Sequence, residues 1–186
     1  MNKLDNTWCL YLHLPNDIDW SINSYKQIFS FNTLDKCIVL VENINKKIIE
    51  NSMIFIMKEN IKPIWEDEKN CKGGCFSYKI LTENIYEIWK KIVYSLIGNT
   101  LTSNIELLNS INGISISPKK NFCILKFCIG DIDYLKNNEI FDIITNKLEN
   151  ESFDSEINYN IDPFKLDRLC NIEKLNCMFK KHKIIY

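Results

Sequence analysis

The sequence predicts an α+β protein in which an antiparallel sheet carries helices on one face and leaves the other face free to bind a ligand. Stretches with the period of two that strands show are interrupted by three separate stretches with helical spacing. Two of the strand-like runs flank a short turn, which indicates a hairpin. Hairpin-joined strands interspersed with helices favour helices stacked on one side of an antiparallel sheet.

Size and composition indicate one globular domain over residues 1–186. The chain has 186 residues, of which 46% are hydrophobic and 25% charged, as in an ordinary soluble globule. The net charge of −1 argues against a strongly basic surface that grips many phosphates, so a bound polyanion should be short. Arg168 is the one arginine, and phosphate recognition would therefore use lysines.

We expect a cytoplasmic protein without a membrane segment. The longest apolar runs, Cys37–Val41 and Met53–Met57, fall short of the about 18 residues of a membrane span. The first residues lead straight into a strand-like stretch, without the apolar region of a secretory signal. The eight cysteines are therefore expected to be reduced thiols, mostly in the core.

No pattern of catalysis or metal binding stands out. Cys71 and Cys75 have the only near-paired spacing, and His13 and His182 are the only imidazoles, so a zinc site is not expected. The sequence shows neither a Gly-rich phosphate loop nor a nucleophile with a paired base. We therefore predict a protein that is not an enzyme and holds no metal or cofactor.

In the first half of the chain, Trp8, Leu10, Leu12 and Leu14 alternate with other residues and predict a strand. Thr33 has the character of an N-cap for a helix over 34–49. Strands are predicted over 53–58 and 74–81. They are separated by a polar loop with Pro63 and the Gly73-Gly74 pair.

In the second half, Thr82 can cap a helix with one apolar stripe that ends at Gly98. Strands over 111–117 and 122–129 flank the hairpin turn Pro118-Lys119-Lys120-Asn121. A third helix is predicted over 134–148, with short strands over 156–161 and 183–186.

The polar loop Ile61–Asn70 carries the most informative chemistry. Trp65 beside Glu66 offers a flat stacking surface next to a hydrogen-bond acceptor, and guanine presents two adjacent donors that one carboxylate can accept together. Trp20, in another polar loop, is the candidate for a second stacking ring. If the base were 7-methylguanine, its positive charge would add about 0.5 to 2 kcal/mol of cation–π energy for each indole.

Each of these residues also has a plainer interpretation. Trp65 or Trp20 could be a core or edge aromatic residue, and Glu66 a solvated loop carboxylate. The lysines of the hairpin turn and of the C-terminus could be ordinary solvated side chains, and Asp67 and Glu68 structural or solvated ones. The remaining residues of note are assigned to the core or to a structural role: Trp8, Trp89 and His13.

These motifs, in this order, resemble the eukaryotic translation initiation factor 4E family, the messenger RNA cap-binding proteins. The resemblance is carried by IKPIWEDEKN with the following GG, by Ile88-Trp89 with Ser95-Leu96-Ile97-Gly98, by Ile111-Asn112-Gly113 and by the opening strand at Trp8. It covers residues 4–129 and, more weakly, the rest. It implies a curved antiparallel sheet with three helices on its convex face and a slot for the cap on its concave face.

The resemblance also implies roles for individual residues. Trp20 and Trp65 look like the pair that stacks on the cap base, and Glu66 like the acceptor for the guanine edge, with a backbone N–H of Trp65 or Glu66 for the guanine O6. The lysines implied to bind the cap phosphates are Lys119, Lys120, Lys181 and Lys183. The implied partners are capped mRNA and a scaffold initiation factor, bound by a monomer.

The chain departs from the family pattern on both faces. Cys75 replaces a basic residue after the double glycine, and Leu125, or Lys126 in a shifted register, replaces a third tryptophan. On the convex face that binds partners, Ile38 replaces a tryptophan and Lys90 and Lys91 replace leucine and glutamate. We therefore expect a divergent cognate scaffold. The alternative is a same-fold interaction protein or translational repressor with weak or no cap binding, which works through its convex face.

Overall fold

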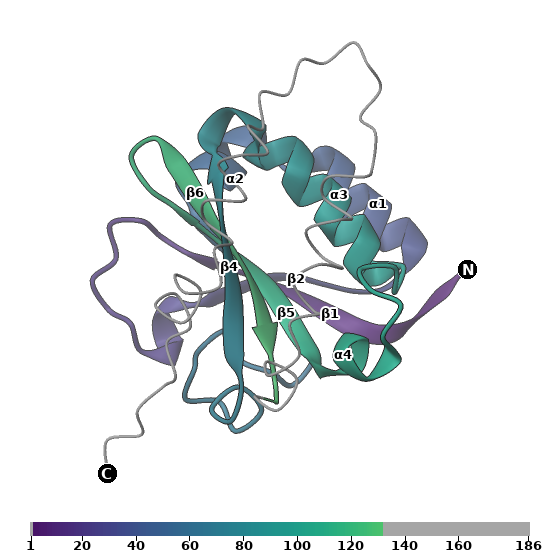
Figure 1. Ribbon diagram of the computed structural model, residues 1–186. Helices are drawn as coiled ribbons and strands as arrows, with labels where there is room; N and C mark the ends of the chain where they lie inside the picture. Colours follow the sequence, from purple (N-terminus) through teal and green to yellow (C-terminus); the bar gives the residue numbers. More distant parts are fainter. Residues whose placement is uncertain (1, 132–186) are drawn as a thin grey trace.

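Residues 2–131 are described in the computed structural model, and they form one curved, six-stranded antiparallel sheet with helices on its convex face (Figure 1). The strand order is β2-β1-β3-β5-β6-β4, and every neighbouring pair is antiparallel. The strands are β1 (Lys3–His13), β2 (Lys26–Thr33), β3 (Met53–Lys58), β4 (Gly74–Leu81), β5 (Ile111–Pro118) and β6 (Phe122–Ile129). The predicted fold class is confirmed.

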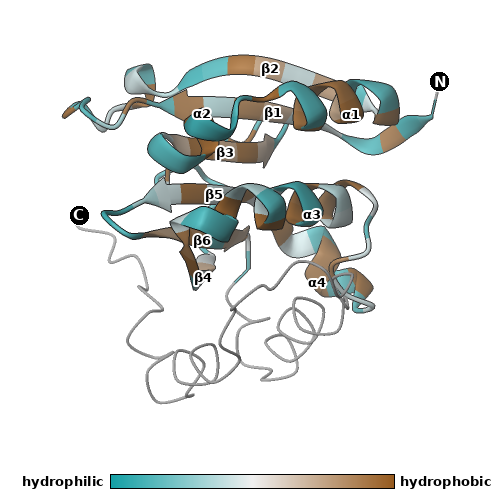
Figure 2. Ribbon diagram, turned by 90° about the horizontal axis from the view of Figure 1, so that it is seen from above, coloured by the Kyte–Doolittle hydropathy of each residue, from teal (hydrophilic) through white to brown (hydrophobic). Residues whose placement is uncertain are grey.

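The helices cover one face of this sheet, as the view from above shows (Figure 2). They are α1 (Leu34–Asn43), α2 (Lys46–Asn51), α3 (Ile85–Ile97) and α4 (Ile105–Ser110), with short 3₁₀ turns η1 (Ile22–Ser24) and η2 (Thr82–Asn84). Trp8 and Trp89 are buried between helices and sheet, as predicted. Among residues 2–131, none of the helices has the length and apolar composition that crossing a bilayer takes.

The predicted helix over 34–49 is two helices. Thr33 caps α1 as expected, because its side chain accepts a hydrogen bond from the Lys36 amide at 3.4 Å. The backbone then becomes extended at Ile44, and the Asn45 side chain caps α2 by accepting from the Lys47 amide at 2.9 Å. The apolar spacing continues across this break, but a side-chain cap at Asn45 competes with continued helix.

The cap of the helix that ends at Gly98 also differs from prediction. Thr82 is the first residue of η2, and α3 begins after Asn84, whose side chain makes no cap hydrogen bond. At the other end, Gly98 is the C-cap as predicted, and Asn99 supplies the positive φ of 54° that turns the chain away.

The sequence patterns do not predict β2 or α4. β2 is an edge strand in which half of the residues are exposed, and it lacks a regular apolar alternation along its whole length. α4 is only six residues long and is held by the cap of Asn104 on the Leu107 amide at 3.0 Å. The helix predicted over 134–148 and the strands over 156–161 and 183–186 lie outside the described residues.

Alternation along the strands gives the sheet two different apolar faces. The convex side forms the main core with the helices. On the concave side a second, smaller cluster consists of Phe55, Met57 and Ile61, with four half-buried residues packed against it: Tyr11, Tyr25, Met53 and Cys128. We call this cluster the concave floor.

Candidate functional site

The loop between β3 and β4 folds back over the concave face. It leaves the sheet after Lys58, yet its residue Ile61 is buried against Phe55 and Met57 in the concave floor. Asn60 makes the turn possible by adopting a φ of 64°, a conformation that Asn tolerates better than most residues. The apolar anchor at Ile61 therefore holds the polar residues that follow it over the sheet.

Asp67 organises this loop from within. Its carboxylate accepts hydrogen bonds from the backbone amides of Lys62 and Lys69, both at 3.0 Å. Its carbonyl accepts from the amides of Asn70 and Cys71 at 2.8 and 2.9 Å. The loop tip is thus a hydrogen-bonded turn, and Asp67 is a structural residue, one of the two roles left open by the sequence.

Two asparagines fasten the loop to β5. The Asn112 amide donates to the Lys69 carbonyl at 2.7 Å and to the Asn70 Oδ1 at 2.9 Å. The Asn70 amide in turn donates to the carbonyls of Lys62 and Ile64. Gly73 completes the attachment, because a Cβ there would overlap the Ile129 carbonyl. The loop is therefore fixed at both ends.

Trp65 and Glu66 occupy the tip of this fixed loop. Trp65 is 44% exposed, and Glu66 is also exposed. Such exposure of a large indole is that of a surface ring and not of a core residue. The pKa of Tyr25 is raised above its usual value, mainly by burial and to a lesser extent by the negative charge of Glu66. Glu66 thus lies within electrostatic range of Tyr25.

Trp20 lies in the β1–β2 loop with one indole face covered and the other available. It is 59% exposed and stacks on His13, with ring centroids 4.4 Å apart and an interplanar angle of 10°. The His13 Nε2 lies 3.0 Å from the Asp19 carbonyl oxygen. Asp19 also accepts hydrogen bonds from Ser21 N and Oγ, which hold the pKa of Asp19 below its usual value. The turn that carries Trp20 is therefore ordered.

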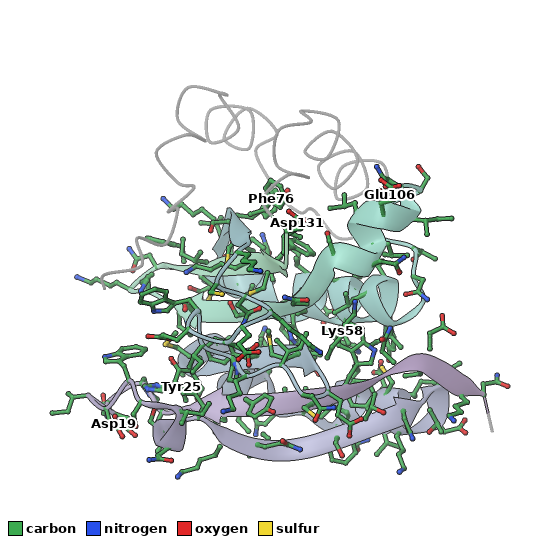
Figure 3. All side chains as sticks on the ribbon, turned by 90° about the horizontal axis from the view of Figure 1, so that it is seen from below. Asp19, Tyr25, Lys58, Phe76, Glu106 and Asp131 are labelled. Carbon is green, nitrogen blue, oxygen red and sulfur yellow. The ribbon has the colours of Figure 1, made fainter. Side chains whose placement is uncertain are left out.

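Tyr25 connects the two loops. Its ring packs on His13 at 4.9 Å and edge-on against Phe55 at 5.3 Å. Asp19 and Tyr25 lie at the same end of the sheet, away from Lys58 (Figure 3). Through Tyr25, the Trp20 stack, the concave floor and the carboxylate of Glu66 are brought to one region.

The predicted phosphate-site lysines are only partly described. Lys119 and Lys120 are exposed in the β5–β6 turn, which the strand register places at the same end of the sheet as His13. Lys181 and Lys183 lie outside the described residues.

Leu125 and Lys126, the two candidates for the position of the third tryptophan, lie on opposite faces of the sheet. Leu125 is fully buried in the main core on the helix side. Lys126 is half-buried on the concave side, in register with Ser77 of β4 and Ser115 of β5. Of the two, Lys126 is the residue that faces the candidate site.

On the convex face, Ile38 is 42% exposed on α1. Lys90 of α3 donates to Glu42 Oε2 of α1 at 2.6 Å, and Tyr94 donates to the Oε1 of the same carboxylate at 2.6 Å. These contacts lower the pKa of Glu42 and raise that of Lys90. Much of the Lys90 charge is thus compensated within the fold. Lys91, its neighbour, is half-buried.

Sequence reasoning did not identify Tyr25 and Asn112 as parts of this site. Tyr25 sits at the end of η1, before an irregular edge strand, where no periodic signal marks a buried face. Asn112 is a buried polar residue in β5 whose amide carries donors as well as an acceptor, and the need to satisfy them is the signal that could have identified it.

His13 is expected to position Trp20. In a Trp65→Phe background, Trp20 is the one exposed tryptophan of the four in the chain. We expect His13→Ala to raise the acrylamide quenching of Trp20 fluorescence and to lower the free energy of unfolding by about 1 kcal/mol, the value of one aromatic stack. His13→Phe, which can still stack, should leave the quenching near that of the parent. Equal quenching in the alanine variant and the parent would contradict the role.

The family model described as Eukaryotic initiation factor 4E matches residues 3–170. A relative from Acanthamoeba polyphaga mimivirus, named Eukaryotic translation initiation factor 4E homolog, is 31% identical over an alignment of 136 residues, and the match covers 62% of this chain and 50% of that protein. Eukaryotic translation initiation factor 4E of Saccharomyces cerevisiae is 27% identical over an alignment of 126 residues, and the match covers 64% of this chain and 57% of that protein. The chain thus spans about half the length of these relatives.

Solved structures share the fold. Ascaris suum eIF4E-3 in complex with the m7G cap has a TM-score of 0.69 at 23% identity, with 80% of this chain and 84% of that chain covered. Caenorhabditis elegans eIF4E-3 in complex with the 4E-binding protein Mextli has a TM-score of 0.67 at 20% identity, with coverages of 83% and 89%. Proteins of this family are translation factors and not enzymes, in agreement with the prediction of a non-catalytic protein. Because the family model covers nearly the whole sequence, the chain belongs to the eukaryotic initiation factor 4E family.

Proposed function

We propose that the concave face binds the 7-methylguanosine 5′ cap of messenger RNA and that the protein acts in translation initiation in the cytoplasm. The observation that carries the proposal is the fixed loop, which holds an exposed indole and an exposed carboxylate side by side over the concave floor. Family membership and the likeness to a protein bound to the m7G cap support it.

In this proposal Trp20 and Trp65 hold the base between them. His13 covers the inner face of Trp20, so that the outer face is the one offered to the ligand. A 7-methylguanine ring carries positive charge, and each indole would add about 0.5 to 2 kcal/mol of cation–π attraction that unmethylated guanine lacks. Methyl selectivity would then come mainly from these two rings.

Glu66 reads the guanine edge. Its carboxylate would accept the N1–H and the exocyclic amine together, and a backbone N–H of Trp65 or Glu66 would donate to the O6. Asp67 and Asn112 keep this carboxylate in place through the loop, although neither would touch the base.

The triphosphate would extend toward the β5–β6 turn. Lys119 and Lys120 are exposed at that end of the sheet, and we propose that they contact the phosphates together with Lys181 and Lys183 of the C-terminal region. Lysines act there as point charges, so phosphate binding should weaken as salt concentration rises.

The convex face would bind a scaffold initiation factor. The likeness to a protein solved with a 4E-binding protein supports a partner on this fold. Ile38 is exposed on α1, and Lys90 is already paired with Glu42, so the partner should have a surface adapted to these residues and to Lys91. We propose that residues 1–186 form a single cap-binding domain that acts as a monomer.

The test is tryptophan fluorescence during titration with 7-methyl-GTP and, separately, GTP. We expect quenching by the methylated ligand at concentrations where GTP has little effect, and an affinity about 10- to 100-fold lower in Trp65→Ala, because base–aromatic stacking contributes about 1 to 3 kcal/mol per base. Lys72→Ala, an exposed change in the same loop, is the matched control.

The alternative, an interaction protein without cap affinity, makes the opposite prediction for the same titration. Two features favour it: Cys75 stands where the family pattern has a basic residue, and the third tryptophan of that pattern is replaced. Quenching that does not depend on the methyl group, or an affinity for 7-methyl-GTP that is unchanged in Trp65→Ala, would contradict cap binding by this loop and favour the alternative.

A further inference from the structure

Two thiols face each other across β4 and β6 on the concave side. Cys75 and Cys128 are directly opposite in the antiparallel register, with their Sγ atoms 3.8 Å apart, and both side chains are half-buried. We propose that this pair is an oxidative modification site, at which a hydroperoxide converts the two thiols into a cross-strand disulfide. The proposal does not depend on cap binding.

The backbone already has a spacing that a disulfide accepts. Residues directly opposite in an antiparallel pair have Cα atoms about 4.5 or 5.5 Å apart. Both values fall within the range of about 4.4 to 6.8 Å found in disulfides. The Sγ atoms must close from 3.8 Å to about 2.05 Å, which side-chain rotation can supply without a change of strand register.

The surroundings make one thiol the more reactive. The neighbouring Cys128 thiol and the positive charge of Lys126 hold the pKa of Cys75 below its usual value, while the pKa of Cys128 is raised well above its own. Because the thiolate is the nucleophile, Cys75 should react first, with Cys128 as the resolving thiol. In contrast, burial raises the pKa of Cys37 to about 11.

The chemistry balances in two steps. The Cys75 thiolate attacks one oxygen of hydrogen peroxide, the O–O bond breaks, and the departing hydroxide takes up a proton, which leaves a sulfenic acid and water. The Cys128 sulfur then attacks the Cys75 sulfur and the S–O bond breaks. The hydroxide that leaves takes the thiol proton as a second water. The two thiols lose two electrons, which reduce one peroxide.

The disulfide would act on the loop that carries Trp65. β4 begins at Gly74, directly after the end of that loop, and Cys128 packs against the concave floor. A bond between Cys75 and Cys128 would therefore tie the end of the loop to the surface beneath it. We expect the oxidised protein to open this loop less often than the reduced one.

The first test maps disulfides in the full chain. Reduced protein is treated with hydrogen peroxide, the remaining thiols are alkylated, and peptides are identified by mass spectrometry. We expect one linked pair of peptides that contain Cys75 and Cys128, with the loss of two hydrogens in mass and reversal by dithiothreitol. Cys71→Ser is the matched control and should oxidise like the wild type, since Cys71 contacts the Glu68 carbonyl and not the pair.

The outcomes separate cleanly. Linkage of either thiol to Cys71, Cys170 or Cys177, or recovery of Cys75 and Cys128 as alkylated thiols after peroxide treatment, would overturn the proposal. Cys75→Ser and Cys128→Ser should each abolish the linked pair. The wild-type peptide map decides the question even if one of these variants folds poorly.

The second test measures the effect on the loop. Hydrogen exchange of the amides of residues 62–73 should slow in the oxidised wild type and return to its original rate after reduction, and Tm should rise by about 5 °C or more. Cys128→Ser treated in the same way should show neither change. Unchanged exchange in a fully disulfide-linked sample would refute the effect on the loop.

Discussion

Glu66→Gln is expected to lower the affinity for 7-methyl-GTP by about 100-fold, since hydrogen bonds to a charged group contribute about 1.5 to 3 kcal/mol each. Glutamine keeps one acceptor oxygen but turns an amide donor toward the second guanine donor, so one bond is lost and a repulsive contact replaces it. The fold should be unaffected, because the Glu66 side chain is exposed. Fluorescence titration measures the affinity, and thermal unfolding checks the fold.

Glu68→Gln is the matched control, an equal loss of charge in the same loop that should change the affinity little. A ligand without the exocyclic amine, 7-methyl-ITP, sharpens the test. It should bind the wild type more weakly than 7-methyl-GTP, whereas Glu66→Gln should discriminate far less between the two ligands. An affinity loss of equal size in Glu68→Gln would mean that overall loop charge, and not edge recognition, is responsible.

Asp67→Ala is expected to weaken 7-methyl-GTP binding by about 10-fold although Asp67 would not touch the ligand. Removing its carboxylate deletes the two hydrogen bonds to the amides of Lys62 and Lys69, each worth about 1 kcal/mol or more to the ordered loop. Ligand binding would then have to order the loop, and the free-energy cost of that ordering would weaken the observed affinity. Hydrogen exchange at residues 62–70 should accelerate in parallel.

Asp67→Asn should have an affinity and a loop exchange rate between those of the wild type and Asp67→Ala. Its single carboxamide oxygen can still accept a hydrogen bond from one of the two amides. The pattern separates positioning from direct contact: Asp67→Ala should change loop exchange and affinity together, whereas Glu66→Gln should change affinity alone. A variant with fast exchange and undiminished affinity would show that loop order does not matter for binding.

The sequence predicted five of the six strands and drew attention to Trp65 and Glu66 of the loop, because both features have strong local signals. Period-two strands and a Trp-Glu pair in a loop with Pro63 and Gly73 can be recognised without knowing the fold. The break at Ile44 could not be predicted from apolar spacing, since the stripe of α1 continues into α2 and only the Asn45 cap ends the first helix. β2 is stabilised by pairing with β1 at the sheet edge, a nonlocal contribution that its own residues do not show.

The same distinction applies to the candidate site. Residue type alone identifies Trp65 and Glu66 as candidates. The attachment of their loop, however, depends on Asn112, which lies 43 residues beyond Lys69 in the chain. The effect of the Glu66 carboxylate on the pKa of Tyr25 depends likewise on the loop folding back over the sheet. Such long-range contacts require the three-dimensional arrangement.

The loop anchored by Ile61 has a consequence for how this protein can change over time. The side chains that hold the loop, Ile61, Asp67 and Asn70, are distinct from the exposed pair at its tip. Mutations of Trp65 or Glu66 can therefore alter what is recognised while leaving the supporting framework intact. A lineage could drift toward a different ligand, or lose binding altogether, and still produce a folded protein with its opposite face available to partners.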